Sequence, residues 1–261
     1  MKNNKAFIVA ICGKGGVGKT SLAALLLDEL ARRKVAGPVL AVDGDPASTL
    51  YLALGTPAPE ATLAGVRETT PLNARTVRNL PAGVTPVEYV AAQMQDAGVI
   101  GEHSLREMPL HLLTMGQGEG PGCYCSINRA LSTALESLTQ RYPIILVDGE
   151  AGLEHLSRYR LGQVDLLLVV STPSRAAQIV AGRIVQTAHQ VGMAIGQAGM
   201  ILNRAPVDLR PKLALPILTN IPDSAYFVAL ERLGLPVVEL PDGNPVRASL
   251  KPVVDSILVG G

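Results

Sequence analysis

The sequence contains few aromatic residues and almost no excess of charge of either sign. Its 261 residues include no Trp, two Phe and six Tyr, and the formal net charge at pH 7 is +1. Hydrophobic residues make up 48%, so a large core can form, but that core must be aliphatic. An aliphatic core is typical of parallel strands that are covered on both faces. The balanced charge argues against nucleic acid as the main partner, since no basic excess is available to neutralise phosphates.

Long apolar runs and paired cysteines are also missing. No apolar run approaches the roughly 20 residues that a transmembrane helix requires. The polar segment 1–5 leads directly into an apolar stretch without a secretory signal. The three cysteines are an odd number and do not form a disulfide framework. We therefore expect a cytoplasmic protein that does not bind a membrane.

A glycine-rich segment near the N-terminus carries the strongest functional signal. It reads GKGGVGKT and lies between an apolar stretch over 6–11 and a predicted helix that begins at Ser21. A strand, a glycine-rich turn and a helix N-terminus in this order form a phosphate cradle, because backbone N–H groups and the helix dipole point at one anion. The pattern GxxxxGK[ST] predicts that Lys19 contacts the β- and γ-phosphates and that Thr20 ligates Mg²⁺. We expect a nucleoside triphosphate to be held by Gly13, Gly15, Gly16, Val17, Gly18, Lys19, Thr20 and Ser21.

A second lysine, Lys14, directly follows the first glycine of this segment. At this point the sequence resembles the deviant Walker A family, which includes the nitrogenase iron protein, MinD proteins, ParA proteins and metallocentre-assembly ATPases. In that family the extra lysine reaches the nucleotide of the other subunit of a homodimer. The resemblance implies a catalytic role for Lys14 beside Lys19, because an incoming cation neutralises charge on the transferred phosphoryl group, as an arginine finger does.

Acidic residues follow two of the predicted strands. Asp43 and Asp45 stand in the sequence DGDP after one apolar stretch, and Asp148 ends another. Open α/β sheets bind ligands beyond the carboxyl ends of their strands, which predicts these carboxylates close to the phosphate loop. The resemblance implies that Asp43 and Asp148 hold Mg²⁺ through water and that Asp45 orients the attacking water. It also implies that Asn203 and Arg204 lie against the adenine.

A CxC motif, formed by Cys123 and Cys125, lies between a predicted strand over 110–115 and a predicted helix over 126–140. At a junction of loop and helix both thiolates can face one point, but one chain supplies two ligands, whereas closed zinc-type sites have four. A homodimer, which Lys14 already implies, supplies two from each chain. We therefore predict an intersubunit site for nickel or zinc. A pair of small buried cysteines, or a reactive pair, is the alternative.

Two further segments narrow the resemblance. The combination of GPGCYC with EAGLEHLSR is similar to the CooC-type ATPases, which mature nickel carbon monoxide dehydrogenases, form nucleotide-linked dimers and bind a metal between subunits. The resemblance runs from Phe7 through about Arg204. It implies an ATP-hydrolysing metallochaperone whose client is a carbon monoxide dehydrogenase or a related nickel enzyme. Two alternatives stay open: a positioning ATPase of MinD or ParA type, and an iron–sulfur electron-transfer ATPase related to the nitrogenase iron protein.

The alternating apolar stretches and predicted helices indicate a doubly wound, mainly parallel α/β sheet of seven or eight strands with helices on both faces. Residues 1–261 are expected to form a single P-loop ATPase domain with a helical insertion at about 56–109. Prolines recur in that insertion, and the sequence Thr85-Pro86 predicts a capped helix start with proline at the first helical position. The sequence does not identify the metal, since four thiolates suit zinc, nickel and iron–sulfur clusters alike.

Overall fold

An eight-stranded sheet forms the centre of the molecule, in the strand order β3-β4-β2-β5-β1-β6-β7-β8. The structure is a computed structural model of the whole chain and describes residues 6–69, 79–116, 136, 140–149, 163–190, 192–210 and 215–260. All neighbouring strands run parallel except β3 and β4, which confirms the predicted mainly parallel sheet. The strands are β1 (Phe7–Gly13), β2 (Val39–Asp43), β3 (Ile100–Leu105), β4 (Met108–Thr114), β5 (Ile144–Asp148), β6 (Gln163–Ser171), β7 (Ala194–Asn203) and β8 (Ile217–Ile221).

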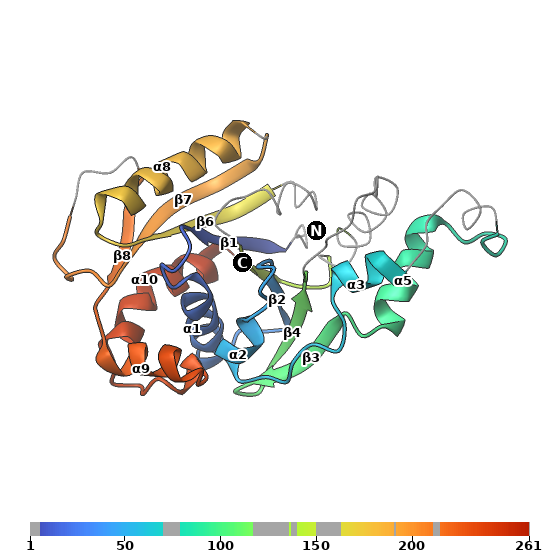
Figure 1. Cartoon of the computed structure of the whole chain (residues 1–261), viewed down its shortest axis with the longest axis horizontal. Coiled ribbons are helices and arrows are strands. Elements are labelled where there is room, and N and C mark those ends of the chain that lie inside the picture. Colours follow the sequence, from blue (N-terminus) through green and yellow to red (C-terminus); the bar gives the residue numbers. More distant parts are fainter. Residues whose placement is uncertain are drawn as a thin grey trace.

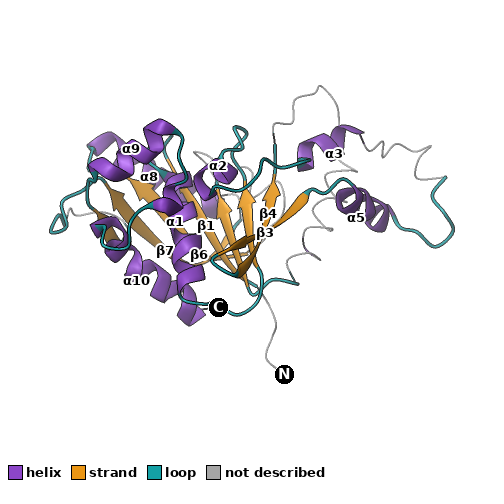
Figure 2. Cartoon of the chain, turned by 90° about the horizontal axis from the view of Figure 1, so that it is seen from below, coloured by secondary structure: helices purple, strands orange, loops and turns teal. Residues whose placement is uncertain are grey.

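Helices cover both faces of this sheet (Figures 1 and 2). Helices α1, α2, α9 and α10 contribute side chains to the hydrophobic cluster on one face, and α3, α5 and α8 contribute to the cluster on the other. In the part of the chain that is described, no helix is both long and apolar enough to cross a membrane. The helices are α1 (Lys19–Arg32), α2 (Leu50–Leu54), α3 (Leu63–Thr69), α5 (Pro86–Asp96), α8 (Arg175–Gln190), α9 (Ala225–Leu233) and α10 (Pro245–Gly260), with a 3₁₀ turn over Val237–Glu239.

The central strands are buried on both sides, as the aliphatic composition predicts. In β1, Val9 and Ile11 belong to the cluster under α1, whereas Ala10 and Cys12 belong to the cluster on the opposite face. Burial raises the pKa of the Cys12 thiol to about 12, with a smaller opposing effect from Lys19. Cys12 is therefore a neutral thiol that packs in the core.

The region at about 56–109, expected to consist of short helices, also contains strand β3. This strand pairs with β4 through a two-residue turn, Arg106–Glu107, in which both residues have positive φ angles, 48° and 71°. Such turns usually contain Asn or Gly, so the sequence offered no hairpin signal here. Leu63 of α3 and Val90 of α5 pack into the same cluster as the core strands.

Helix α5 begins as its sequence predicts. Pro86 is its first residue, and the Thr85 side chain accepts a hydrogen bond from the backbone N–H of Glu88 at 3.2 Å. In return, the Glu88 carboxylate accepts one from the backbone N–H of Thr85 at 2.8 Å. This capping box satisfies two backbone donors that a helix N-terminus otherwise leaves free.

Asp28, in the second half of α1, joins three parts of the fold. Its side chain is fully buried and accepts hydrogen bonds from Arg247 of α10 at 2.7 Å, from Arg106 of the β3–β4 turn at 2.5 Å and from Arg32 at 3.0 Å. Burial acts to raise the pKa of Asp28, but the hydrogen bonds from Arg106, Arg32 and Arg247 outweigh it and hold the pKa below its ordinary value. The pair with Arg247 is also buried, since that side chain is 4% exposed.

We predict that Asp28→Asn lowers the free energy of unfolding by about 3 kcal/mol at pH 7, because it removes one of the two carboxylates that compensate the buried charge of Arg247, the other being Glu29. The folded-state pKa of Asp28 is depressed, so its contribution is present above the ordinary carboxyl range and is lost as the pH falls through the lowered value. The measurement is urea unfolding at pH 7 and at acidic pH.

The matched control is Asp255→Asn, which breaks an exposed pair with Arg33 and is expected to cost less than about 1 kcal/mol. A loss at Asp28 that equals the loss at Asp255, or that stays the same at acidic pH, would contradict the prediction.

Candidate active site

The loop between β1 and α1 adopts the conformation that its glycines predict. Gly13, Gly16 and Gly18 have φ angles of 153°, 77° and 92°. A Cβ atom on Gly13 would collide with the carbonyl oxygen of Val170, and one on Gly18 would lie 2.5 Å from the Asn203 side-chain nitrogen. The loop therefore requires glycine both for its backbone angles and for its close packing on β6 and β7.

The loop presents free donors at its outer surface. Lys14, Gly15 and Gly16 are exposed, whereas Val17 and Lys19 are 4% and 7% exposed. Gly18 caps α1 without a side-chain hydrogen bond, which leaves the first N–H groups of a 14-residue helix available for an anion. Within the described ranges, Lys14 makes no ion pair or hydrogen bond. This geometry suits phosphate groups.

Asp148 ends β5 immediately beside the loop, and it is fully buried. Neither of its carboxylate oxygens has a hydrogen-bond partner among the residues that the structure describes. Burial raises the pKa of Asp148 to about 7, with a smaller contribution from the charge of Asp43. The Thr20 hydroxyl, which lies close to the carboxylate but outside hydrogen-bond geometry, and the Lys19 ammonium oppose the rise. A buried carboxylate without a partner is costly unless a cation or a donor joins it.

These residues fit a magnesium ion that keeps most of its water. Mg²⁺ prefers oxygen ligands and usually binds through one or two carboxylates together with substrate phosphates. Asp148 offers two uncommitted oxygens, and Thr20 adds a hydroxyl beside it. No three carboxylate, imidazole or thiol side chains of the described part converge closely enough to form a direct metal cage. Water-mediated contact is therefore the mode that this donor set supports.

Asp43 and Asp45 lie in the turn that follows β2. The Asp43 carboxylate is 1% exposed and accepts hydrogen bonds from the backbone N–H groups of Asp45 at 3.2 Å and Leu50 at 2.9 Å. Burial raises the pKa of Asp43 to about 6, although the hydrogen bonds from Leu50 and Asp45 counter it. The Asp45 carboxylate accepts a hydrogen bond from the N–H of Ala47 at 2.9 Å, so it is turned into its own loop in this conformation.

Asn203 lies beneath the loop, where its side chain is 1% exposed. Its amide nitrogen donates to the carbonyl oxygen of Val17 at 2.8 Å, and its amide oxygen accepts from the N–H of Arg204 at 3.0 Å. The family resemblance predicts that Asn203 and Arg204 border the adenine. In this conformation Asn203 supports the phosphate loop instead, and its contact with a base stays a prediction.

Glu231 of α9 is part of the site, although no motif in the sequence pointed to it. Its carboxylate accepts a hydrogen bond from the Ser21 hydroxyl at 2.6 Å and pairs with Arg204 at 3.2 Å. Glu231 also lines a cavity of about 200 Å³ beside the first turn of α1, together with Thr20 and Ser21. These contacts join segments that are far apart in the chain, so only the folded structure reveals them.

Two predicted features fall outside the described residues. Cys123 and Cys125 are among them, and so is the segment 150–158 that carries the sequence EAGLEHLSR. The intersubunit metal site and the segment after Asp148 therefore stay predictions from the sequence.

Comparisons with known proteins identify nucleotide-binding relatives of this chain. Residues 8–237 match a family model described as the CobQ/CobB/MinD/ParA nucleotide binding domain. An uncharacterised ATP-binding protein of Methanocaldococcus jannaschii is 30% identical over 259 residues, which cover 96% of this chain and 98% of that protein. The carbon monoxide dehydrogenase accessory protein CooC of Rhodospirillum rubrum is 29% identical over 242 residues, which cover 89% of each chain.

Solved structures share the fold. The cell division ATPase MinD of Pyrococcus furiosus superposes with a TM-score of 0.67 at 23% identity, over 97% of this chain and 99% of that chain. The phosphate loop, the buried carboxylate beside it and these relatives together make the chain a P-loop ATPase. The chain therefore belongs to the CobQ/CobB/MinD/ParA family of nucleotide-binding proteins.

Proposed function

We propose that the chain is a dimeric, ATP-driven metallochaperone that delivers nickel to a carbon monoxide dehydrogenase or a related nickel enzyme. The observation that carries this proposal is the likeness to CooC over 89% of each chain, in a sequence that also contains a CxC motif. The exposure of Lys14, which has no ion pair or hydrogen bond among the described residues, also supports the proposal, because a lysine that acts on a second subunit must be accessible.

In this proposal the residues at the carboxyl ends of the strands prepare ATP for hydrolysis. The backbone N–H groups of the phosphate loop and Lys19 hold the phosphates. Thr20, Asp43 and Asp148 would hold Mg²⁺, the two carboxylates through water, and the ion would neutralise charge on the phosphate oxygens. Asp45 leaves its turn to position the attacking water. Asn203 and Arg204 border the adenine at the far end of the loop.

The partner chain completes the proposed active site. Lys14 from the second subunit approaches the γ-phosphate and stabilises the negative charge that develops there, as an arginine finger does. Closure of the dimer also brings Cys123 and Cys125 of both chains together, so that four thiolates surround one ion. Hydrolysis then removes the γ-phosphate that holds the dimer closed, and the metal is released to the client enzyme.

A positioning ATPase is the second candidate function. The septum site-determining protein MinD of Thermotoga maritima is 25% identical over 243 residues, and the MinD structure of Pyrococcus furiosus shares the fold. Such a protein uses the same ATP switch but has no need for a CxC motif. Metal binding by the cysteines therefore distinguishes the two functions.

We predict that Lys14→Ala retains most of its affinity for ATP but loses hydrolysis by about 10³-fold, the scale of a lost arginine finger. It is also expected to lose ATP-induced dimerisation. Phosphate release and analytical ultracentrifugation measure the two effects. Lys251→Ala, on the exposed face of α10, is the matched control and is expected to behave as wild type. Normal turnover by Lys14→Ala would remove the action between subunits.

We also predict one metal ion per two chains, bound by Cys123 and Cys125 of each chain. Thiolates must lose their protons to bind, so uptake of nickel or zinc releases protons and weakens at low pH. Competition with a chromophoric chelator gives the stoichiometry. Either Cys→Ser change is expected to abolish tight binding without affecting ATP, whereas Cys12→Ala, in the core, is expected to bind normally.

Two results would oppose this metal prediction. A ratio of one ion per chain, or a double serine variant that binds as tightly as wild type, would exclude the shared cysteine site. Bound iron with charge-transfer absorbance after anaerobic purification would favour the iron–sulfur alternative.

A further inference from the structure

Thr114, the last residue of β4, carries a buried hydroxyl group that has no partner in the described part of the chain. The residue is 0% exposed, and its Oγ1 atom makes no hydrogen bond to any residue that the structure describes. Leaving such a group unsatisfied destabilises the folded state, and native proteins contain few of them. Valine has nearly the same shape and would avoid this cost. Among the described residues, the Thr114 hydroxyl is thus an uncommitted donor in the present conformation.

The position of Thr114 links it to the magnesium ligands proposed above. Thr114 lies opposite Asp43 in the β4–β2 register, and Asp43 lies opposite Asp148 in the β2–β5 register. Side chains alternate between the two faces of a strand, so each of these three residues shares a face with the residue two positions before it. The residues two positions before Thr114, Asp43 and Asp148 all belong to the hydrophobic cluster beneath α1: Leu112, Ala41 and Leu146. Thr114, Asp43 and Asp148 therefore lie on the α1 face of the sheet.

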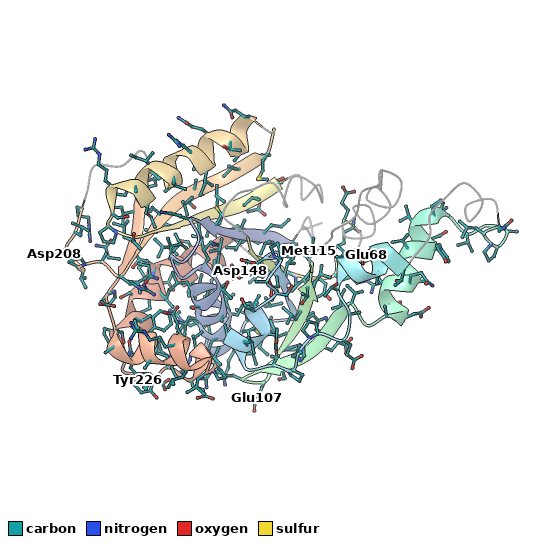
Figure 3. The ribbon with its side chains drawn as sticks, in the orientation of Figure 1. Glu68, Glu107, Met115, Asp148, Asp208 and Tyr226 are labelled. Atoms are coloured by element: carbon teal, nitrogen blue, oxygen red, sulfur yellow. The ribbon has the colours of Figure 1, made fainter. Side chains whose placement is uncertain are left out.

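Thr114, Asp43 and Asp148 thus form one row on the face of the sheet that carries the phosphate-loop helix. Neighbouring strands are about 4.8 Å apart, which makes Thr114 the immediate neighbour of Asp43 on the side away from Asp148. Figure 3 shows this edge of the sheet through two labelled residues, Asp148 and Met115, the residue after Thr114. The Met115 N–H also donates to the Asp43 carbonyl at 2.9 Å, so the two strand ends are joined through their backbones.

The Asp43 carboxylate is committed to the turn that follows it in the present conformation. It accepts hydrogen bonds from the N–H groups of Asp45 and Leu50, and both donors belong to the segment that carries the proposed water-positioning residue. If Asp45 is to leave its turn and face the γ-phosphate, this segment must move and these bonds must change. Asp43 then loses donors at the moment when its orientation toward Mg²⁺ matters.

We propose that Thr114 is a positioning residue that holds Asp43 in the nucleotide-bound state. When Mg²⁺ and nucleotide bind, the Thr114 hydroxyl donates to the Asp43 carboxylate and replaces a backbone donor from the moving turn. A carboxylate accepts up to about four hydrogen bonds, so this bond leaves room for the water shell of the metal. The inference rests on the proposed function, specifically on the placement of Mg²⁺ beside Asp43.

The test compares thermal unfolding with and without Mg²⁺ and ADP in wild type, Thr114→Val and Thr114→Ser. Thr114→Val removes a hydroxyl that has no partner in the free protein, so its metal-free melting temperature is expected to equal or exceed that of wild type. Its stabilisation by Mg²⁺ and ADP is expected to be smaller, with the Mg²⁺ affinity at saturating ADP reduced about tenfold, as expected for one lost hydrogen bond to a charged group. Thr114→Ser retains the hydroxyl and is expected to restore the response.

Two further variants make the result specific. Thr114→Ala also lacks the hydroxyl and must show the same loss of Mg²⁺ affinity, which guards against a packing artefact or poor folding of the valine variant. Thr219→Val is the control for loss of a threonine hydroxyl away from the site. The Thr219 hydroxyl, on β8, donates to the Ser249 carbonyl of α10 at 2.6 Å, so its loss is expected to destabilise the free and the bound protein equally.

The outcomes separate this inference from the proposed site. Thr114→Val and Thr114→Ala could each change the melting temperature equally with and without Mg²⁺ and ADP and leave the Mg²⁺ affinity unchanged. Thr114 would then have a structural role only, and the inference would be overturned while the proposed Mg²⁺ site stands. A wild-type protein whose ADP binding does not depend on Mg²⁺ would overturn the site and the inference together.

Discussion

The buried carboxylate of Asp148 is the constraint around which the nucleotide edge of the sheet is arranged. It lies between β2 and β1 with no exposed surface and with no hydrogen-bond partner in the described structure. Burial of an unpaired carboxylate is unfavourable, and its raised pKa expresses that cost. A proton, a hydrogen-bond donor or a cation relieves this cost. The Thr20 hydroxyl and the Lys19 ammonium lie close enough to Asp148 to lower its pKa, and in the proposed function a magnesium ion takes up the same position.

Helix α1 is fixed at both ends, and this keeps the phosphate loop in place. At its start, Asn203 of β7 donates a hydrogen bond to the Val17 carbonyl of the phosphate loop, and Glu231 of α9 accepts one from the Ser21 hydroxyl in the first turn of α1. At its other end, buried Asp28 is tied by arginines to α10 and to the β3–β4 turn. In the proposed mechanism, helix α1 therefore stays fixed between these two anchors, and the turn after β2, which carries Asp45, is the element that moves.

The sequence predicts the phosphate loop, the carboxylates and the parallel sheet because each depends on a local pattern. Strand β3 was missed because its turn, Arg106–Glu107, lacks the Asn or Gly that usually marks a hairpin. Glu231 was missed because its partner Ser21 is 210 residues away, and the support that Asn203 gives to Val17 spans 186 residues. The unpartnered hydroxyl of Thr114 also has no local signature, since burial and missing partners arise only on folding.

The measurement that tests this account most directly is calorimetric titration of ADP into wild type and Asp148→Asn, with and without Mg²⁺. If Asp148 holds the metal, Mg²⁺ strengthens ADP binding in wild type and loses most of that effect in the variant. Because the substitution removes a buried, unpartnered carboxylate, metal-free ADP binding is expected to be retained. An Asp148→Asn protein that gains as much affinity from Mg²⁺ as wild type would contradict the account.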